Sequence, residues 1–197
     1  MSSEQIRDVC LQVIAILERL GVPYLVAGSL ASSLLGKPRQ TLDADLVADL
    51  SEAHVGPFLA ALGEAYYVEP ATVRDAVRRK RTFNLIHLDT MLKVDVFPIR
   101  DEPYARLDFS RRVKLPYFDV PRREVWCASA EDIVLHKLRW FHAGGKVAQR
   151  QWSDAVDVLR VQRERLDRAY LAQWAAHFGI GDFLARAQAE AEAADGA

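Results

Sequence analysis

The sequence predicts an α+β fold, in which a core of strands and helices is followed by a helical region. Apolar runs of strand length alternate with amphipathic segments over the first two thirds of the chain. Two of these runs, 83–88 and 91–99, are separated by a two-residue turn, which predicts an antiparallel hairpin. From Ser129 onward every pattern is helical. We therefore expect an α/β core over residues 1–128 and a helical region over residues 129–197 that packs on it.

Each element of the core follows from apolar spacing and from the residues that cap or break it. A first helix is expected to begin at Ser2 or Ser3 and to end at Gly21, and a short buried strand over 24–27 ends at Gly28. Besides the hairpin, the other core elements expected are a short helix over 30–35, a strand over 42–47, an amphipathic segment over 53–65 whose helix begins near Pro57, an edge strand over 66–68, a helix over 70–81, a loop or short helix over 101–111, and a second hairpin of 113–120 and 124–128 with Pro121 in its turn.

The helical region opens with Ser129 and Asp132, which fit a capping pair. A Gly144-Gly145 break follows the first helix. Three further helices are expected over residues 149–162, 166–178 and 182–193.

Composition excludes several classes of protein. The net charge of the 197 residues is −1, so no overall basic field indicates nucleic acid, although a local basic patch remains compatible with it. Cys10 and Cys127 match no zinc or redox spacing, which suits a reducing interior. The sequence has no signal-peptide core and no apolar run of membrane-spanning length, so we expect a cytoplasmic location and no membrane partner.

The stretch from Tyr24 to Asp49 carries the strongest indication of chemistry. Gly28 and Ser29 form a turn at the start of a short helix, where free backbone N–H groups can bind phosphate. On the next strand, Asp43 and Asp45 are two positions apart and emerge on one side, with backbones roughly 6–7 Å apart. Carboxylates this close repel unless a cation lies between them, and oxygen ligands suit magnesium. The alternative is a surface strand with solvated aspartates.

A third carboxylate, Asp95, is flanked by Val94 and Val96 in an otherwise apolar strand. Burying it is costly unless something compensates the charge, and a bound cation would do so. The alternative is that Asp95 faces water. His87, on the neighbouring strand, fits a structural histidine better than a catalytic base. The basic residues from Arg74 to Arg81 fit either a solvated helix face or a site for phosphate or RNA.

In this order, Gly28-Ser29, Asp43-x-Asp45 and Asp95 within V-D-V-F resemble the polymerase-β-like nucleotidyltransferase superfamily. The helical segments EDIVLHKLRW and RQWSDAVDVL resemble the last motif of the AbiEii-type (type IV toxin) nucleotidyltransferases. That motif falls here on Lys137, Arg150 and Asp154. The first motif departs from the toxin pattern, because it reads G-S rather than G-G-T and the usual basic residue is displaced to Lys37 and Arg39.

The resemblance implies the nucleotidyltransferase fold, a mixed twisted sheet flanked by helices with a C-terminal helical extension. It also implies a nucleoside triphosphate (NTP) as substrate and two Mg²⁺ ions. The catalytic and metal-binding residues would be Asp43, Asp45 and Asp95, with Asp95 placed to take a proton from the attacking hydroxyl. The nucleotide-binding residues would be Gly28, Ser29, Arg39, Thr41 and Lys137. Arg150 and Asp154, four apart on a helix, fit a structural pair better than direct chemistry.

Three functions remain open from the sequence. The toxin-like motif favours transfer of a nucleotide (NMP) to RNA such as tRNA, and it implies a cognate antitoxin as a partner. The same chemistry could instead act on a small hydroxylated molecule or on a protein side chain. The third alternative is a nucleotide-binding module without turnover, against which the complete set of mutually repelling acids argues.

Overall fold

The computed structural model describes residues 3–118, 120, 122–144 and 148–193. The chain divides into two compact units: the first contains Met1–Leu30 and Gln40–Cys127, and the second contains Ala31–Arg39 and Ala128–Ala197. The segment from Ala31 to Arg39 therefore groups with the helical region rather than with the strands around it in sequence. The expected packing of residues 129–197 on the core stays a prediction.

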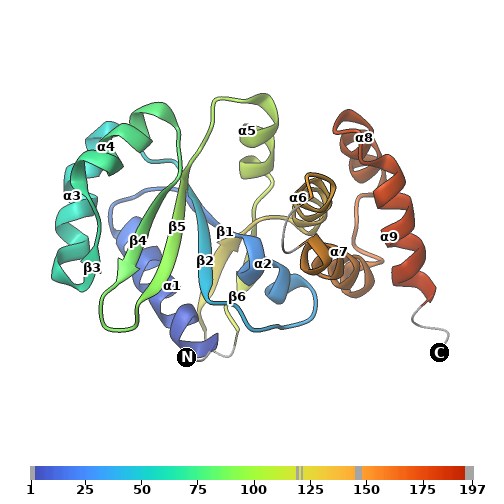
Figure 1. The fold of residues 1–197 in the computed structure, drawn as a ribbon, viewed down its shortest axis with the longest axis horizontal. Helices are drawn as coiled ribbons and strands as arrows, with labels where there is room; N and C mark the ends of the chain where they lie inside the picture. Colours follow the sequence, from blue (N-terminus) through green and yellow to red (C-terminus); the bar gives the residue numbers. More distant parts are fainter. Residues whose placement is uncertain (1–2, 119, 121, 145–147, 194–197) are drawn as a thin grey trace. The chain divides into compact units, whose positions relative to one another are not determined.

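The first unit contains a mixed sheet of seven strands among the described residues, in the order β3-β4-β5-β2-β1-β7-β6 (Figure 1). The pairs β2–β5 and β1–β7 are parallel, and the other neighbours are antiparallel. This arrangement confirms the mixed sheet flanked by helices. The strands are β1 (Tyr24–Ala27), β2 (Asp43–Ala48), β3 (Tyr66–Tyr67), β4 (Phe83–His87), β5 (Leu92–Pro98), β6 (Val113–Pro116) and β7 (Glu124–Cys127).

One face of this sheet is sealed by α1 (Ser3–Arg19), which contacts β2 and β5. Along both strands buried and half-buried residues alternate, because successive side chains point to opposite faces. The buried set is aliphatic and includes Leu46, Val94 and Val96, all with no exposed surface. The half-buried set, on the opposite face, carries the acidic residues. The hydrophobic face therefore fixes the register that determines where those acids lie.

The remaining helices of the first unit are α3 (Glu52–Leu62), α4 (Pro70–Arg79) and α5 (Pro103–Ser110), with a 3₁₀ turn at Gly63–Ala65. In the segment 101–111, for which a loop and a short helix were both open, residues 103–110 thus form a helix. The expected start of α3 near Pro57 is wrong, because the helix begins five residues earlier, at Glu52. The N–H of Ser51 donates to Nδ1 of His54 at 3.1 Å, which fastens that first turn.

The second hairpin is shorter than expected. Strand β6 ends at Pro116 rather than at Val120, because Phe118 adopts a left-handed conformation with φ 45° that breaks the extended run. Pro121, expected in the turn, lies outside the described residues, as do Ser2 and Gly145.

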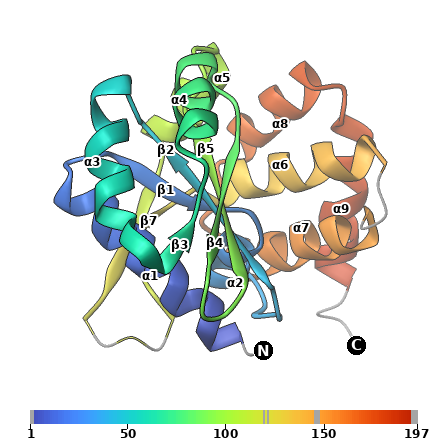
Figure 2. The same cartoon turned by 60° about the vertical axis from the view of Figure 1, so that its left-hand side comes forward.

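The second unit holds α6 (Ala130–His142), α7 (Ala148–Gln162), α8 (Arg168–His177) and α9 (Gly181–Ala193), as Figure 2 shows, together with the last turns of α2 (Gly28–Leu35). Ser129 caps α6 by accepting the N–H of Asp132 at 3.2 Å, as predicted. Gly36 lies so close to α7 that a Cβ would stand 3.0 Å from the amide nitrogen of Val158. None of the described helices combines the length and the apolar character needed to cross a membrane.

Candidate active site

Two of the predicted acids are direct neighbours in the sheet. The parallel register of β2 and β5 sets Asp45 beside Asp95, and it sets Asp43 beside Lys93. Residues in register across two strands share a face, so all four side chains emerge on the face opposite α1. The structure thus brings together, within one unit, three carboxylates from parts of the sequence about fifty residues apart.

Gly28 packs directly against the Asp45 carboxylate of this cluster. It has φ +58°, and a Cβ at this position would stand 1.8 Å from Oδ2 of Asp45. Only glycine therefore allows the start of α2 to approach the Asp45 carboxylate this closely. Ser29 follows as the second residue of α2, in the first turn of the helix, where the backbone N–H groups have no intrahelical partner. The predicted phosphate turn and the predicted acids are adjacent.

Lys93 is the residue of this cluster that sequence reasoning missed. Its Nζ lies 2.8 Å from Oδ2 of Asp95. The pKa of Lys93 is raised, first by its hydrogen bond to Asp95 and further by the charges of Asp95, Asp43 and Asp45, which together outweigh its partial burial. Strand alternation could have found it, because residues 93 and 95 share a face. The compensating charge that a valine-flanked aspartate requires is supplied here by a lysine.

The oxygen atoms of the cluster fit a hard cation. In the part of the chain that the structure describes, no group of three or more His, Cys, Asp or Glu side chains stands assembled as a metal centre. Oδ1 of Asp95, however, is buried and has no hydrogen-bond partner, although Oδ2 is bound to Lys93. Thr41, predicted as a nucleotide contact, donates from Oγ1 to Oδ1 of Asp43 at 2.7 Å. This donor set matches the oxygen ligands that Mg²⁺ prefers.

The second unit contains the other predicted nucleotide-binding residues, Arg39 and Lys137, which converge on Asp154. Arg39 donates from Nε to Oδ1 at 2.6 Å and from Nη2 to Oδ2 at 2.9 Å. Nζ of Lys137 lies 2.7 Å from Oδ2, and Oγ of Ser32 donates to the same oxygen at 3.2 Å. Lys137 and Asp154 each expose only 5% of the side chain. The carboxylate of Asp154 is thus the centre of a buried ion network, which the sequence did not predict.

This network corrects the expected pairing of Arg150 with Asp154. Among the described ion pairs, Asp154 bonds to cations from α6 and from the loop after α2, whereas Arg150 is exposed. A buried carboxylate needs partners that are buried with it, and an exposed arginine on the same helix cannot meet that need. Burial alone would raise the pKa of Asp154, but hydrogen bonding to Arg39 and the charge of Lys137 hold this pKa below the ordinary aspartate value.

Two further candidates have ordinary structural contacts. On α4, Arg78 and Arg79 both bond to Asp75, at 2.8 and 2.7 Å, so part of the basic cluster is neutralised within its own helix. His87 is buried, and its Nδ1 lies 2.9 Å from Oγ1 of Thr90. These contacts fit a structural role for Arg78, Arg79 and His87.

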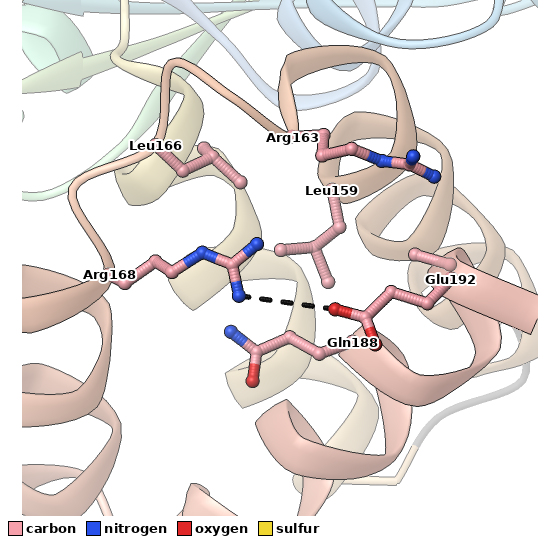
Figure 3. A pocket seen from close by; sticks show the side chains of 7 residues that line it. Leu159, Arg163, Leu166, Arg168, Gln188 and Glu192 are labelled. Atoms are coloured by element: carbon pink, nitrogen blue, oxygen red, sulfur yellow. Dashed lines mark ion pairs between the residues drawn. The ribbon is translucent and has the colours of Figure 1, made fainter.

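Two hollows in the described part of the chain lie away from the predicted residues. The first, in the second unit, has a volume of about 20 Å³, and Arg168 and Glu192 approach to 3.9 Å at its edge (Figure 3). That volume suits about one water molecule. The other, about 290 Å³, lies in the first unit beside Glu18 and Trp126, and Glu18 is already bonded to Tyr24 and Arg123. Neither is lined by a predicted site residue.

Comparison with solved structures places this geometry in a known fold. An antigenic nucleotidyltransferase-like protein from Paracoccidioides brasiliensis aligns over 81% of this chain and 77% of its own, with 17% identity and a TM-score of 0.57. The lincosamide antibiotic adenylyltransferase LnuA, solved with lincomycin bound, aligns over 76% of this chain and 95% of its own, with 16% identity and a TM-score of 0.50. ANT(2'')-Ia in complex with adenylyl-2''-tobramycin aligns over 87% and 95%, with 15% identity and a TM-score of 0.51.

The chain has the nucleotidyltransferase fold. No family model matches the chain, and no curated protein sequence matches it. At these identities the likeness shows the fold alone, so the AbiEii-type resemblance stays a prediction. The case for a function therefore rests on what this structure itself shows, the carboxylate cluster on β2 and β5 and the glycine turn at the start of α2.

Replacing Gly28 by alanine tests the contact between the turn and Asp45. We expect the free energy of unfolding to fall by about 2–4 kcal/mol, because positive φ and overpacking both penalise the new methyl group. Gly21, just after α1, has φ +66° but nothing within 4 Å of an added Cβ, so Gly21→Ala should lose only about 1 kcal/mol. Urea unfolding of both variants measures the difference. Equal losses would show that Gly28 does not press on Asp45.

Replacing Asp154 by asparagine tests the buried network. At pH 7 we expect a loss of about 2–4 kcal/mol, because Lys137 is left buried without its counter-charge. Because the folded-state pKa of Asp154 is lowered, its stabilisation is present above the ordinary aspartate pKa of about 4 and is lost as pH falls through the folded value. The gap in stability between wild type and variant should therefore narrow below about pH 4.

Asp157→Asn on the same helix is the matched control. Asp157 exposes 27% of its side chain and pairs with Lys37 at 3.6 Å, so its loss should cost no more than about 1 kcal/mol. Denaturant unfolding of the wild type and of both variants from pH 3 to pH 7 measures how each free energy of unfolding depends on pH. A gap for Asp154→Asn that stays constant with pH would contradict the network.

Proposed function

We propose that this protein is a Mg²⁺-dependent nucleotidyltransferase that transfers a nucleoside monophosphate from an NTP to a hydroxyl group of a small molecule. The observation that carries the proposal is the register of Asp45 beside Asp95, with Gly28 against the Asp45 carboxylate. Carboxylates meeting beside a helix N-terminus combine the two requirements of phosphoryl chemistry, a place for metal and a place for phosphate.

In this proposal each residue of the cluster has a defined task. Asp43, Asp45 and Asp95 hold magnesium, which when bound neutralises the charge on the phosphates. Ser29 and the first backbone N–H groups of α2 bind the β and γ phosphates. Thr41 orients the carboxylate of Asp43 through the hydrogen bond to its Oδ1.

The reaction itself is an in-line displacement. The acceptor oxygen attacks the α-phosphorus, the new O–P bond forms, and the bond from the α-phosphorus to the bridging oxygen breaks, so that pyrophosphate leaves. The proton of the acceptor hydroxyl passes to the carboxylate of Asp95. Arg39 and Lys137 stay predicted contacts of the triphosphate.

A small-molecule acceptor has more support than the RNA acceptor that the toxin-like motif favours. LnuA was solved with lincomycin and ANT(2'')-Ia with adenylyl-2''-tobramycin, so this fold accommodates transfer to small hydroxylated compounds in other proteins. The basic cluster on α4, which an RNA acceptor would use, is partly neutralised by Asp75. An antitoxin partner and a cytoplasmic location stay predictions from the sequence.

Substitution of the acids tests the chemistry. Asp43→Asn and Asp95→Asn should each lower nucleotidyl transfer by at least about a hundredfold, because each removes a charge that the metal-bound transition state needs. The exposed Asp89, in the turn between β4 and β5, gives the matched control, and Asp89→Asn should keep full activity. The assay incubates each protein with Mg²⁺ and α-labelled NTPs, with small hydroxylated molecules, tRNA and protein offered as separate acceptor pools.

The same assay decides the acceptor. Label in the small-molecule pool supports the proposal, whereas label only in tRNA would replace it with the RNA-directed reaction. Wild-type activity in Asp43→Asn or Asp95→Asn would overturn the catalytic assignment, whichever acceptor is labelled.

A further inference from the structure

Lys93 lies on the same sheet face as the three carboxylates and contacts one of them. In register, β2 presents Asp43 and Asp45, and β5 presents Lys93 and Asp95, so the four side chains form two rows on one sheet face. Three of them are acidic, and the fourth is a lysine whose Nζ lies 2.8 Å from Oδ2 of Asp95. Lys93 exposes 42% of its side chain, whereas Asp95 exposes only 14%. A part-exposed cation therefore meets a carboxylate that is largely buried.

This contact differs from the exposed ion pairs elsewhere in the described chain. An isolated surface pair contributes little, because water already solvates both charges. Here the ammonium also lies in the field of Asp43 and Asp45, so it offsets the repulsion among three carboxylates as well as the charge of one. A metal ion at the same carboxylates would relieve the same repulsion, and two cations close to one carboxylate repel each other.

We propose that Lys93 is the resident counter-ion of the carboxylate cluster and that it competes with magnesium for Asp95. Without metal, the ammonium of Lys93 offsets the repulsion among the three carboxylates. When magnesium binds, the flexible, part-exposed side chain of Lys93 leaves Oδ2 of Asp95. Lys93 therefore acts as a positioning residue that sets the magnesium concentration at which the cluster is loaded. The inference rests on the proposed function, because it requires the acids to bind metal.

Magnesium binding to Lys93→Met tests this competition without measuring activity. Isothermal titration calorimetry of the full chain with Mg²⁺ alone should give a dissociation constant about three- to tenfold lower than that of the wild type, because metal no longer displaces a lysine. In EDTA, the melting temperature of Lys93→Met should fall by about 2–4 °C, because the acids lose their counter-ion. Lys93→Arg should stay close to wild type in both measurements.

Lys114→Met is the matched control, since Lys114 is an exposed sheet lysine paired with Glu124 at 3.6 Å on the β6–β7 pair. It should leave magnesium affinity unchanged. If Lys93→Met binds magnesium with wild-type affinity, the competition is overturned while the proposed function stands. If neither wild type nor Lys93→Met binds magnesium, both the competition and the metal part of the proposed function fail.

Discussion

Mutual repulsion among Asp43, Asp45 and Asp95 is the constraint on which the whole site depends. Three carboxylates on one face of two hydrogen-bonded strands repel one another unless positive charge lies nearby. The described chain supplies one such charge in Lys93, 2.8 Å from Asp95. One lysine leaves the cluster with an excess of negative charge and a buried carboxylate oxygen without a partner. That imbalance is what makes a divalent cation the expected ligand.

The fold holds the acids in place by means that have nothing to do with their charge. Helix α1 and the aliphatic residues of β2 and β5 seal one sheet face, and a slip of one residue would bury the acids and expose Leu46 and Val94. The hydrophobic effect thus fixes the register, and the register fixes the spacing of the carboxylates. Gly28 completes the arrangement, because its missing side chain lets the phosphate turn reach Asp45.

Much of this architecture was predictable from the sequence, and the exceptions have physical causes. Alternation along the strands predicted which residues face together, and most helix and strand limits fell within a few residues of the structure. The start of α3 was misplaced because Pro57 is tolerated inside the helix and the Ser51–His54 contact fixes the true first turn. The partners of Asp154 were missed because they come from α6 and from the loop after α2, far away in sequence, and periodicity carries no information about such contacts.

Anomalous diffraction from crystals soaked with Mn²⁺ and a non-hydrolysable NTP tests the central claim most directly. We expect a manganese peak within bonding distance of the Asp45 and Asp95 carboxylates, with Nζ of Lys93 moved away from Asp95. A manganese peak elsewhere on the protein, with the Lys93–Asp95 ion pair intact and nucleotide bound away from Gly28, would contradict the account.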